Sequence, residues 1–166
     1  MEKMIKLFAM DVDGTLTDGG VYMDGRGGEW KRFDIQDGMG IARLKASGVV
    51  IAFVSGRPSP ATDQRAKDLG VDRVYNGAGD KLSVLQELAF ELGLSREEIA
   101  YMGDDVNDLP AMEWAGLGMA PANALPEVKA ASDWVTSSCG GHGAVREAAE
   151  RILELNASGA KGESSH

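Results

Sequence analysis

The sequence predicts an α/β fold with a doubly wound, mostly parallel sheet of the Rossmann type. Short apolar runs alternate along the chain with amphipathic segments of helical period, as in repeated β-α units. The run Val49–Val54 is apolar on both faces, which is typical of a central strand in a parallel sheet. The 166 residues, of which 43% are hydrophobic, suffice for one domain around one core.

The expected elements follow one another in a regular order. Strands are expected at Met4–Met10, Val49–Val54, Arg73–Tyr75, Ile99–Met102, Leu117–Ala120 and Trp134–Val135. Helices with one apolar face are expected at Gly40–Ala46, Ala61–Leu69, Lys81–Leu92 and Gly143–Leu155. Ser95–Glu98 has the pattern of a capping box that opens a short turn. We expect a single domain over residues 1–155 and a mobile tail over residues 156–166, which are polar and small.

One segment interrupts the alternation of strands and helices. Val21–Phe33 has the pattern of two short strands around a glycine-rich turn, and it predicts a β-hairpin flap over about residues 16–33. The hairpin is inserted between the first strand and the first helix. In a doubly wound fold this position lies above the carboxyl ends of the strands, where ligands bind. The insertion is too short to form a large cap domain.

Charge and composition exclude several classes of protein. The chain has 26 acidic and 17 basic residues, and a net charge of -9 argues against a nucleic-acid partner. The same charge would repel a phosphate ester unless a bound cation and positioned lysines or arginines reverse the local field. The single cysteine, Cys139, suits a reducing cytoplasm. Because Met4–Met10 is too short for a signal peptide and no apolar run is long enough to span a bilayer, we expect a cytoplasmic protein without membrane association.

The strongest chemical signal is the motif Asp-Val-Asp-Gly-Thr at Asp11–Thr15, directly after an apolar strand. Side chains two apart on a strand share a face, so the carboxylates of Asp11 and Asp13 converge at the strand's end. Gly14 permits a sharp turn there. Two carboxylates and a backbone carbonyl suit a hard cation such as Mg²⁺, and a carboxylate can attack phosphorus to form an aspartyl-phosphate. Taken alone, the motif also fits an acidic turn.

Three further motifs follow the ends of other predicted strands or begin a helix. Gly103–Asp108 adds carboxylates for a Mg²⁺ shell, or begins a helix with Asp105 as its cap and Asp108 in its first turn. Ser55–Arg57 offers a hydroxyl and turn amides to a phosphoryl group, or is an ordinary turn. Lys81 opposes the dipole of the helix that it begins, so it either binds phosphate or is a solvated surface lysine.

The order of the four motifs resembles the haloacid-dehalogenase-like phosphatase superfamily, and its capless subclass in particular. The hairpin and the segments Phe33–Ile41, Gly79–Lys81, Tyr101–Asp105 and Gly140–Glu147 resemble the phosphatases of 3-deoxy-D-manno-octulosonate 8-phosphate and of the related keto-deoxynononate 9-phosphate. The resemblance covers nearly the whole chain. It implies a Mg²⁺-dependent phosphomonoester hydrolase of lipopolysaccharide biosynthesis, acting on a keto-deoxy sugar acid phosphate through an aspartyl-phosphate. It also implies a homotetramer in which hairpins form a central barrel and a neighbouring subunit covers the active site.

The same resemblance implies a role for each candidate residue. Asp11 is the implied nucleophile and Asp13 the general acid and then base, while Ser55 and Lys81 bind the phosphoryl group. The implied metal ligands are Asp11, Asp13 through its carbonyl, and Asp104, with support from Asp105 and Asp108. The implied substrate-binding residues are Asp13, Asp34, Ile35, Gln36, Asp37, Gly38, Ser55, Gly56, Arg57, Arg65 and Lys81. Two positions depart from the octulosonate pattern, because Ala42 and His142 stand where an arginine is usual.

Four other functions share some of these sequence features. A phosphatase of a different small sugar phosphate has the same motifs. A phosphatase-like regulatory module attached to a sugar cytidylyltransferase need not keep Asp11, Asp13, Lys81 and Asp104, which are all present. A phosphotransferase or mutase usually has a helical cap that excludes water, and the segment after Thr15 is too short for one. A receiver-like signalling domain shares an acidic cluster and a lysine but not the Asp-Val-Asp-Gly-Thr motif.

Overall fold

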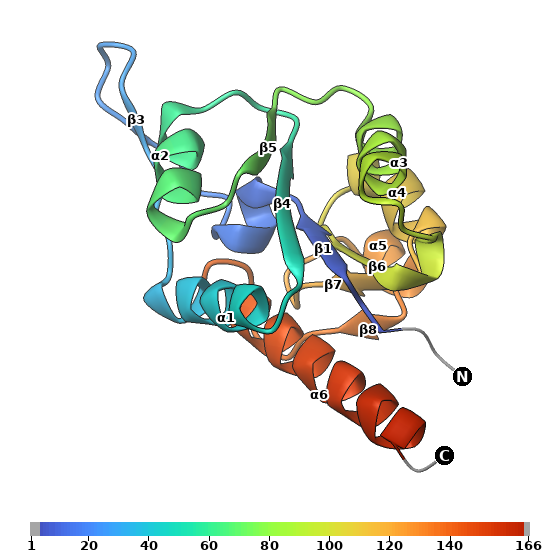
Figure 1. The fold of residues 1–166 in the computed structure, drawn as a ribbon. Coiled ribbons are helices and arrows are strands. Elements are labelled where there is room, and N and C mark those ends of the chain that lie inside the picture. Colours follow the sequence, from blue (N-terminus) through green and yellow to red (C-terminus); the bar gives the residue numbers. More distant parts are fainter. Residues whose placement is uncertain (1–3, 165–166) are drawn as a thin grey trace.

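The computed structural model describes residues 4–164, with side chains described as far as residue 159, and its centre is a six-stranded sheet (Figure 1). The strands lie in the order β5 (Arg73–Asn76), β4 (Val50–Ser55), β1 (Leu7–Met10), β6 (Ile99–Met102), β7 (Leu117–Ala120) and β8 (Trp134–Val135). Every neighbouring pair is parallel. The chain winds outward from β1 first to one edge and then to the other, so the predicted doubly wound fold is confirmed.

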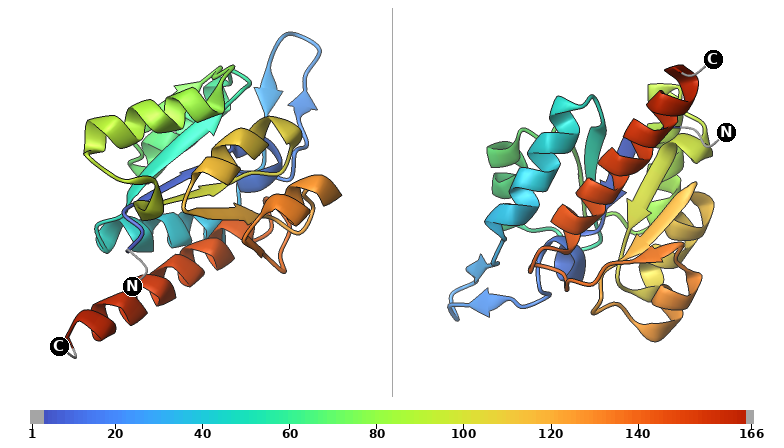
Figure 2. Two further views of the ribbon diagram at one scale, coloured as in Figure 1. Left: turned by 90° about the vertical axis from the view of Figure 1, so that its right-hand side faces the viewer. Right: turned by 90° about the horizontal axis from the view of Figure 1, so that it is seen from below.

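Helices cover both faces of this sheet (Figures 1 and 2). One face is covered by α1 (Ile35–Ala46), α2 (Pro60–Leu69) and α6 (Ala144–Ser164), and the other by α3 (Lys81–Leu92), α4 (Leu109–Trp114) and α5 (Pro126–Ala131). Along β1, Phe8 and Met10 are buried in the first layer, whereas Leu7 and Ala9 are buried in the second. This two-sided burial explains why the central strands β1, β4 and β6 are apolar at almost every position.

The predicted hairpin is present and projects from the body of the molecule beside α2 (Figures 1 and 2). Its strands β2 (Tyr22–Met23) and β3 (Glu29–Trp30) are antiparallel, and Tyr22 pairs with Trp30. The side chains of this pair are 57% and 67% exposed. The hairpin therefore presents an apolar surface to solvent.

The helices agree with the prediction where their length made the pattern visible. α2 and α3 begin and end within one residue of the predicted bounds. α1 begins at Ile35 instead of Gly40, because the side chain of Asp34 caps it by accepting from the backbone N–H of Gln36 at 2.7 Å. α4 and α5 have six residues each, too few to show a helical period.

None of the helices between residues 4 and 164 combines the length and the apolar character that crossing a bilayer requires.

The carboxyl-terminal part of the chain differs from the prediction. α6 does not end at Leu155 but continues through most of the expected tail to Ser164. The side-chain amide of Asn156 exchanges two hydrogen bonds with the backbone of Ile5, at 2.8 and 2.9 Å. The helix end expected at Leu155 is therefore wrong, because Asn156 continues the helix and ties it to the start of the sheet. Residues 165–166 of the expected tail lie outside the described residues.

Asp37 joins two helices that are distant in sequence. Its side chain is fully buried and accepts a hydrogen bond at 3.0 Å from the backbone N–H of Arg146, in the first turn of α6. The helices approach closely beside it, because a Cβ atom added to Gly40 would lie 3.0 Å from the Cα atom of Arg146. Burial raises the pKa of Asp37 and outweighs the opposing hydrogen bond from Arg146. Asp37 therefore caps α6 from the side of α1.

We predict that Asp37→Ala lowers the free energy of unfolding by about 1–2 kcal/mol, because it removes a helix cap. Asp37→Asn keeps an acceptor oxygen but no longer titrates. Because the folded-state pKa is raised above 3.8, the stability linked to protonated Asp37 is complete below that value and is lost as pH rises through the raised pKa. Urea unfolding from pH 4 to 8 should therefore show wild type losing stability relative to Asp37→Asn. Parallel pH profiles of the two proteins would contradict this.

Candidate active site

The carboxyl ends of β1, β4 and β6 surround a cavity of about 300 Å³. This is where the strand order reverses about β1, the position at which doubly wound folds bind ligands. The cavity is lined by Asp11, Asp13, Gly19, Val21, Gly56, Arg57, Lys81, Asp104, Asp105 and Asn107. All four predicted motifs therefore contribute to one cavity.

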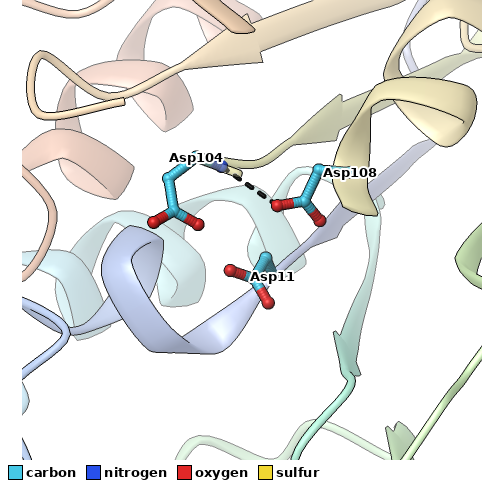
Figure 3. A group of neighbouring side chains, drawn as sticks. All are labelled: Asp11, Asp104 and Asp108. Carbon is cyan, nitrogen blue, oxygen red and sulfur yellow. Dashed lines mark hydrogen bonds between the residues drawn. The ribbon is translucent and has the colours of Figure 1, made fainter. Parts of the chain in front are cut away.

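Three carboxylates lie close together (Figure 3), and two of them, Asp11 and Asp104, line this cavity. Asp11 follows β1, Asp104 follows β6, and Asp108 ends the helical turn η3 (Val106–Asp108). Their oxygens lie within 4.8 Å of one another. The parallel pairing of β1 and β6 brings them together, because the backbone N–H of Asp11 still donates to Met102 at 2.9 Å beyond the paired strands.

Lys81 is part of this cluster and is 3% exposed, so it is not a solvated surface lysine. Its Nζ atom lies 2.8 Å from Oδ1 of Asp11 and 2.8 Å from Oδ1 of Asp108. The helix that begins at Lys81 is capped by Asp80, whose side chain accepts from Ser83. Burial lowers the pKa of Lys81, but the two carboxylates outweigh it and raise the pKa above its ordinary value. Lys81 therefore remains an ammonium ion at neutral pH.

Asp108 organises the cluster through both of its oxygens. Oδ1 accepts from Lys81 and, at 2.7 Å, from the hydroxyl of Tyr101. Oδ2 accepts from the backbone N–H groups of Asp104 at 3.1 Å and Asp105 at 3.3 Å. Burial, followed by the charge of Asp108, raises the pKa of Tyr101, so the phenol stays a neutral donor. With four donors already bound, Asp108 supports the site and leaves Asp11 and Asp104 to meet a ligand.

The charges of the cluster fit a divalent cation. Burial raises the pKa of Asp11, Asp108 raises it further, and Lys81 opposes the shift. Burial also raises the pKa of Asp104, whose buried Oδ1 atom has no hydrogen-bond partner among the described residues. Three carboxylates face one ammonium ion, which leaves two negative charges in excess when all are ionised. Asp11 and Asp104 offer the oxygen ligands that a hard cation such as Mg²⁺ prefers.

The turn after β1 has the shape that the motif predicted. Gly14 has a φ of 90°, and a Cβ atom at this position would collide with the carboxylate of Asp104. The hydroxyl oxygen of Thr17 accepts from the N–H of Gly14 at 3.3 Å, and the side chain of Asn123 donates to its carbonyl at 3.0 Å. Asn123 also accepts from Gly140 at 2.7 Å. Asn123 was not predicted, since nothing in its neighbourhood along the sequence distinguishes it from an ordinary turn residue.

The turn Ser55–Arg57 reaches the cavity through its last two residues. Ser55 is buried, and its hydroxyl donates to the carbonyl of Arg57 at 3.0 Å and accepts from the same residue's N–H at 3.3 Å. Gly56 and Arg57 line the cavity. The guanidinium of Arg57 forms an ion pair with Glu29 of β3, so the hairpin contacts the rim of the site.

The other predicted substrate-binding residues lie elsewhere. Asp34–Gly38 form the cap and first turn of α1, and none of them lines the cavity. Arg65 donates to the carbonyl of Asp34 at 3.3 Å and is also absent from the lining. Ala42 and His142, the two departures from the family pattern, are exposed outside the cavity. The cavity of one chain therefore gathers Asp11, Asp13, Gly56, Arg57 and Lys81, but Ser55, Asp34–Gly38 and Arg65 do not line it.

Comparisons with known proteins agree with this geometry. Residues 73–147 match the family of haloacid dehalogenase-like hydrolases. The 3-deoxy-D-manno-octulosonate 8-phosphate phosphatase KdsC of Escherichia coli K12 is 40% identical over 149 residues, which are 90% of this chain and 79% of that protein. The corresponding Moraxella catarrhalis phosphatase, solved with magnesium ion, phosphate ion and 3-deoxy-D-manno-octulosonate (KDO), is 43% identical with a TM-score of 0.90 and covers 97% and 92% of the two chains. A cobalt-bound Haemophilus influenzae phosphatase is 40% identical with a TM-score of 0.89, covering 92% and 90%.

A doubly wound sheet with a carboxylate cluster and a buried lysine at the ends of its central strands fits the class of hydrolase that the matched family defines. An identity of 40% over most of both chains shows membership of the same family, and not only a shared fold. The chain belongs to the haloacid dehalogenase-like hydrolase family, and within it to the phosphatases.

Proposed function

We propose that the protein is a Mg²⁺-dependent phosphomonoester hydrolase of a keto-deoxy sugar acid phosphate, with 3-deoxy-D-manno-octulosonate 8-phosphate as first candidate and its nine-carbon analogue as second. The observation that carries the proposal is the buried cluster of Asp11, Asp104, Asp108 and Lys81, which opens into the cavity with two negative charges in excess. The names of the relatives support the choice of substrate. With that substrate, the enzyme would act in lipopolysaccharide biosynthesis.

The proposed reaction has two steps at phosphorus. A carboxylate oxygen of Asp11 attacks in line, and an aspartyl-phosphate forms as the bond to the sugar oxygen breaks. Asp13 donates its proton to the departing alkoxide. Asp13 then takes a proton from a water molecule, whose oxygen attacks the aspartyl-phosphate, releases inorganic phosphate and restores Asp11.

The surrounding residues stabilise charge on the transferring oxygens. Lys81 and the amides of the turn Ser55–Arg57 are the proposed phosphoryl ligands. Asp11, Asp104 and the carbonyl of Asp13 would hold Mg²⁺, with Asp108 and Asp105 in support, and the bound ion would offset the charge of the phosphate. Two buried carboxylates with raised pKa values resist ionisation together, so a bound cation would favour the ionised form of both.

We further propose that the protein works as a homo-oligomer, with a tetramer as the expected state. The exposed hairpin residues Tyr22, Met23 and Trp30 support such an interface. Ile35 and Gln36 are exposed next to the hairpin but outside the cavity of their own chain. A neighbouring subunit would be the source of the sugar-side contacts that one chain does not assemble.

A substrate screen with controlled metal tests the proposed function. Phosphate release should fall to background in EDTA and return with added Mg²⁺. At saturating Mg²⁺, kcat/KM for an eight- or nine-carbon keto-deoxy sugar acid phosphate should exceed that for glucose 6-phosphate by about 10²-fold, because a site built for a carboxylate rejects a substrate that lacks it. Equal values for the two would indicate a general sugar phosphatase. No release from any substrate would indicate a regulatory module.

A further inference from the structure

The hairpin places a buried lysine beside Asp13. Lys31 directly follows β3, its side chain is 0% exposed, and its Nζ atom lies 2.8 Å from Oδ1 of Asp13. Apart from this ion pair, neither atom has a hydrogen-bond partner among the described residues. Asp13 itself lines the cavity. Among the residues that the structure describes, the ammonium of Lys31 therefore has Asp13 as its single partner, and Asp13 belongs to the proposed catalytic machinery.

The contact follows from the alternation of side chains along the hairpin strand. Glu29 and Lys31 are two residues apart and share a face, on which Glu29 contacts Arg57 and Lys31 contacts Asp13. Trp30 lies between them in sequence and is 67% exposed. One face of the strand thus makes two ionic contacts with two motifs of the site, while the other face meets solvent.

Stability alone does not explain this placement. A lysine on a projecting hairpin could stay solvated at little cost, whereas burying an ammonium ion costs several kcal/mol before its partner is counted. A two-stranded hairpin is itself only marginally stable. Burial of Lys31 against one carboxylate therefore does not stabilise the hairpin. Its effect is expected at Asp13.

We propose that Lys31 is a positioning residue for Asp13, an inference that rests on the proposed role of Asp13 as general acid and base. The ion pair through Oδ1 restricts the Asp13 side chain to one orientation and leaves Oδ2 for proton exchange with the departing alkoxide and with water. The hairpin then has a part in catalysis within its own chain, in addition to the interface expected of it.

Two substrates with different leaving groups distinguish a positioning role of Lys31 from phosphoryl binding and from a structural role. An alkoxide leaves a sugar phosphate only with a proton from the general acid, whereas p-nitrophenolate leaves without one. The value of kcat/KM reports the steps up to departure of the leaving group. Lys31→Met should therefore lower kcat/KM for the sugar acid phosphate by roughly 10–100-fold and for p-nitrophenyl phosphate by less than about threefold. Lys31→Arg should recover most of the loss, because it restores a cation to the same side chain.

The matched control is Arg26→Met, which removes an exposed cation at the tip of the same hairpin and should change neither value. Equal losses for both substrates in Lys31→Met would overturn the proposal, since they would indicate phosphoryl binding or a structural role.

A double-mutant cycle of Lys31→Met with Asp13→Asn, followed by urea unfolding, tests the contact without substrate. The changes in the urea unfolding midpoint are expected to be non-additive. Additive changes would also overturn the proposal. If the wild-type protein hydrolysed none of the phosphate esters, the proposed function would be overturned instead. The double-mutant cycle would still test the contact between Lys31 and Asp13.

Discussion

Asp11→Asn should reduce phosphate release by at least about 10³-fold and leave the fold intact. The amide has nearly the shape of the carboxylate but cannot attack phosphorus, and it is a weaker ligand for a cation. The substitution should not destabilise the metal-free protein. Because burial raises the folded-state pKa of Asp11, its ionised form opposes folding once the pH is above that pKa. In EDTA at pH 8, the Tm of the variant should therefore equal or exceed that of wild type.

The matched control is Asp72→Asn, which makes the same chemical change at an exposed position outside the cavity. Phosphate release should be unchanged in this control, and circular dichroism should give the same spectrum for all three proteins. Added Mg²⁺ should raise the Tm of wild type more than that of Asp11→Asn, since one of the two available carboxylates is lost. Turnover near the wild-type value in Asp11→Asn would show that the nucleophile lies elsewhere.

The central strands could be predicted from sequence because they are buried on both faces. Val50–Ser55 and Ile99–Met102 are apolar along almost their whole length, and the structure has them within one residue of their predicted bounds. Short helices are harder, because α4 and α5 do not complete two turns and so show no period. The end of α6 was missed for another reason. Its last residues are small and polar, and the contact of Asn156 with Ile5 depends on the tertiary fold.

The core of the site could be predicted because the order of motifs along a parallel sheet determines where they meet. Asp11 and Asp104 follow adjacent strands, and Lys81 reaches both Asp11 and Asp108 from the start of the next helix. Contacts made by loops could not be predicted in this way. Lys31 lies in a charged segment of a hairpin that looks solvated until the chain folds back on the site.

Asp37 has a contact that neither its sequence neighbourhood nor the family resemblance predicted. The family pattern groups it with substrate-side residues, yet in this structure it is fully buried, and its partner in α6 is 109 residues away. No local feature of the sequence distinguishes a carboxylate that binds a ligand from one that caps a distant helix. The partner in the folded chain distinguishes them, because Asp37 contacts the first turn of α6 whereas Asp11 lines the cavity.

Lys81→Met should lower kcat by roughly 10²–10³-fold, because it removes a preorganised cation from the phosphoryl site. It should also destabilise the metal-free protein by about 3–5 kcal/mol, since a buried ion pair is broken and its carboxylates lose their counter-charge. Added Mg²⁺ should recover part of this stability but little of the turnover. Lys67→Met, which changes an exposed lysine on α2, is the control and should affect neither property.

The response to Mg²⁺ separates the role of Lys81 from that of a metal ligand. Removing the ammonium increases the excess negative charge of the cluster, so the midpoint of a Mg²⁺ titration followed by Tm should move to equal or lower concentration in Lys81→Met. Asp104→Asn removes a negative charge and a ligand, so its midpoint should move to higher concentration, with turnover partly restored by excess Mg²⁺. The two variants should thus shift metal affinity in opposite directions while both lose activity. A shift to higher concentration in both would mean that Lys81 holds the metal site together and does not act on the phosphoryl group.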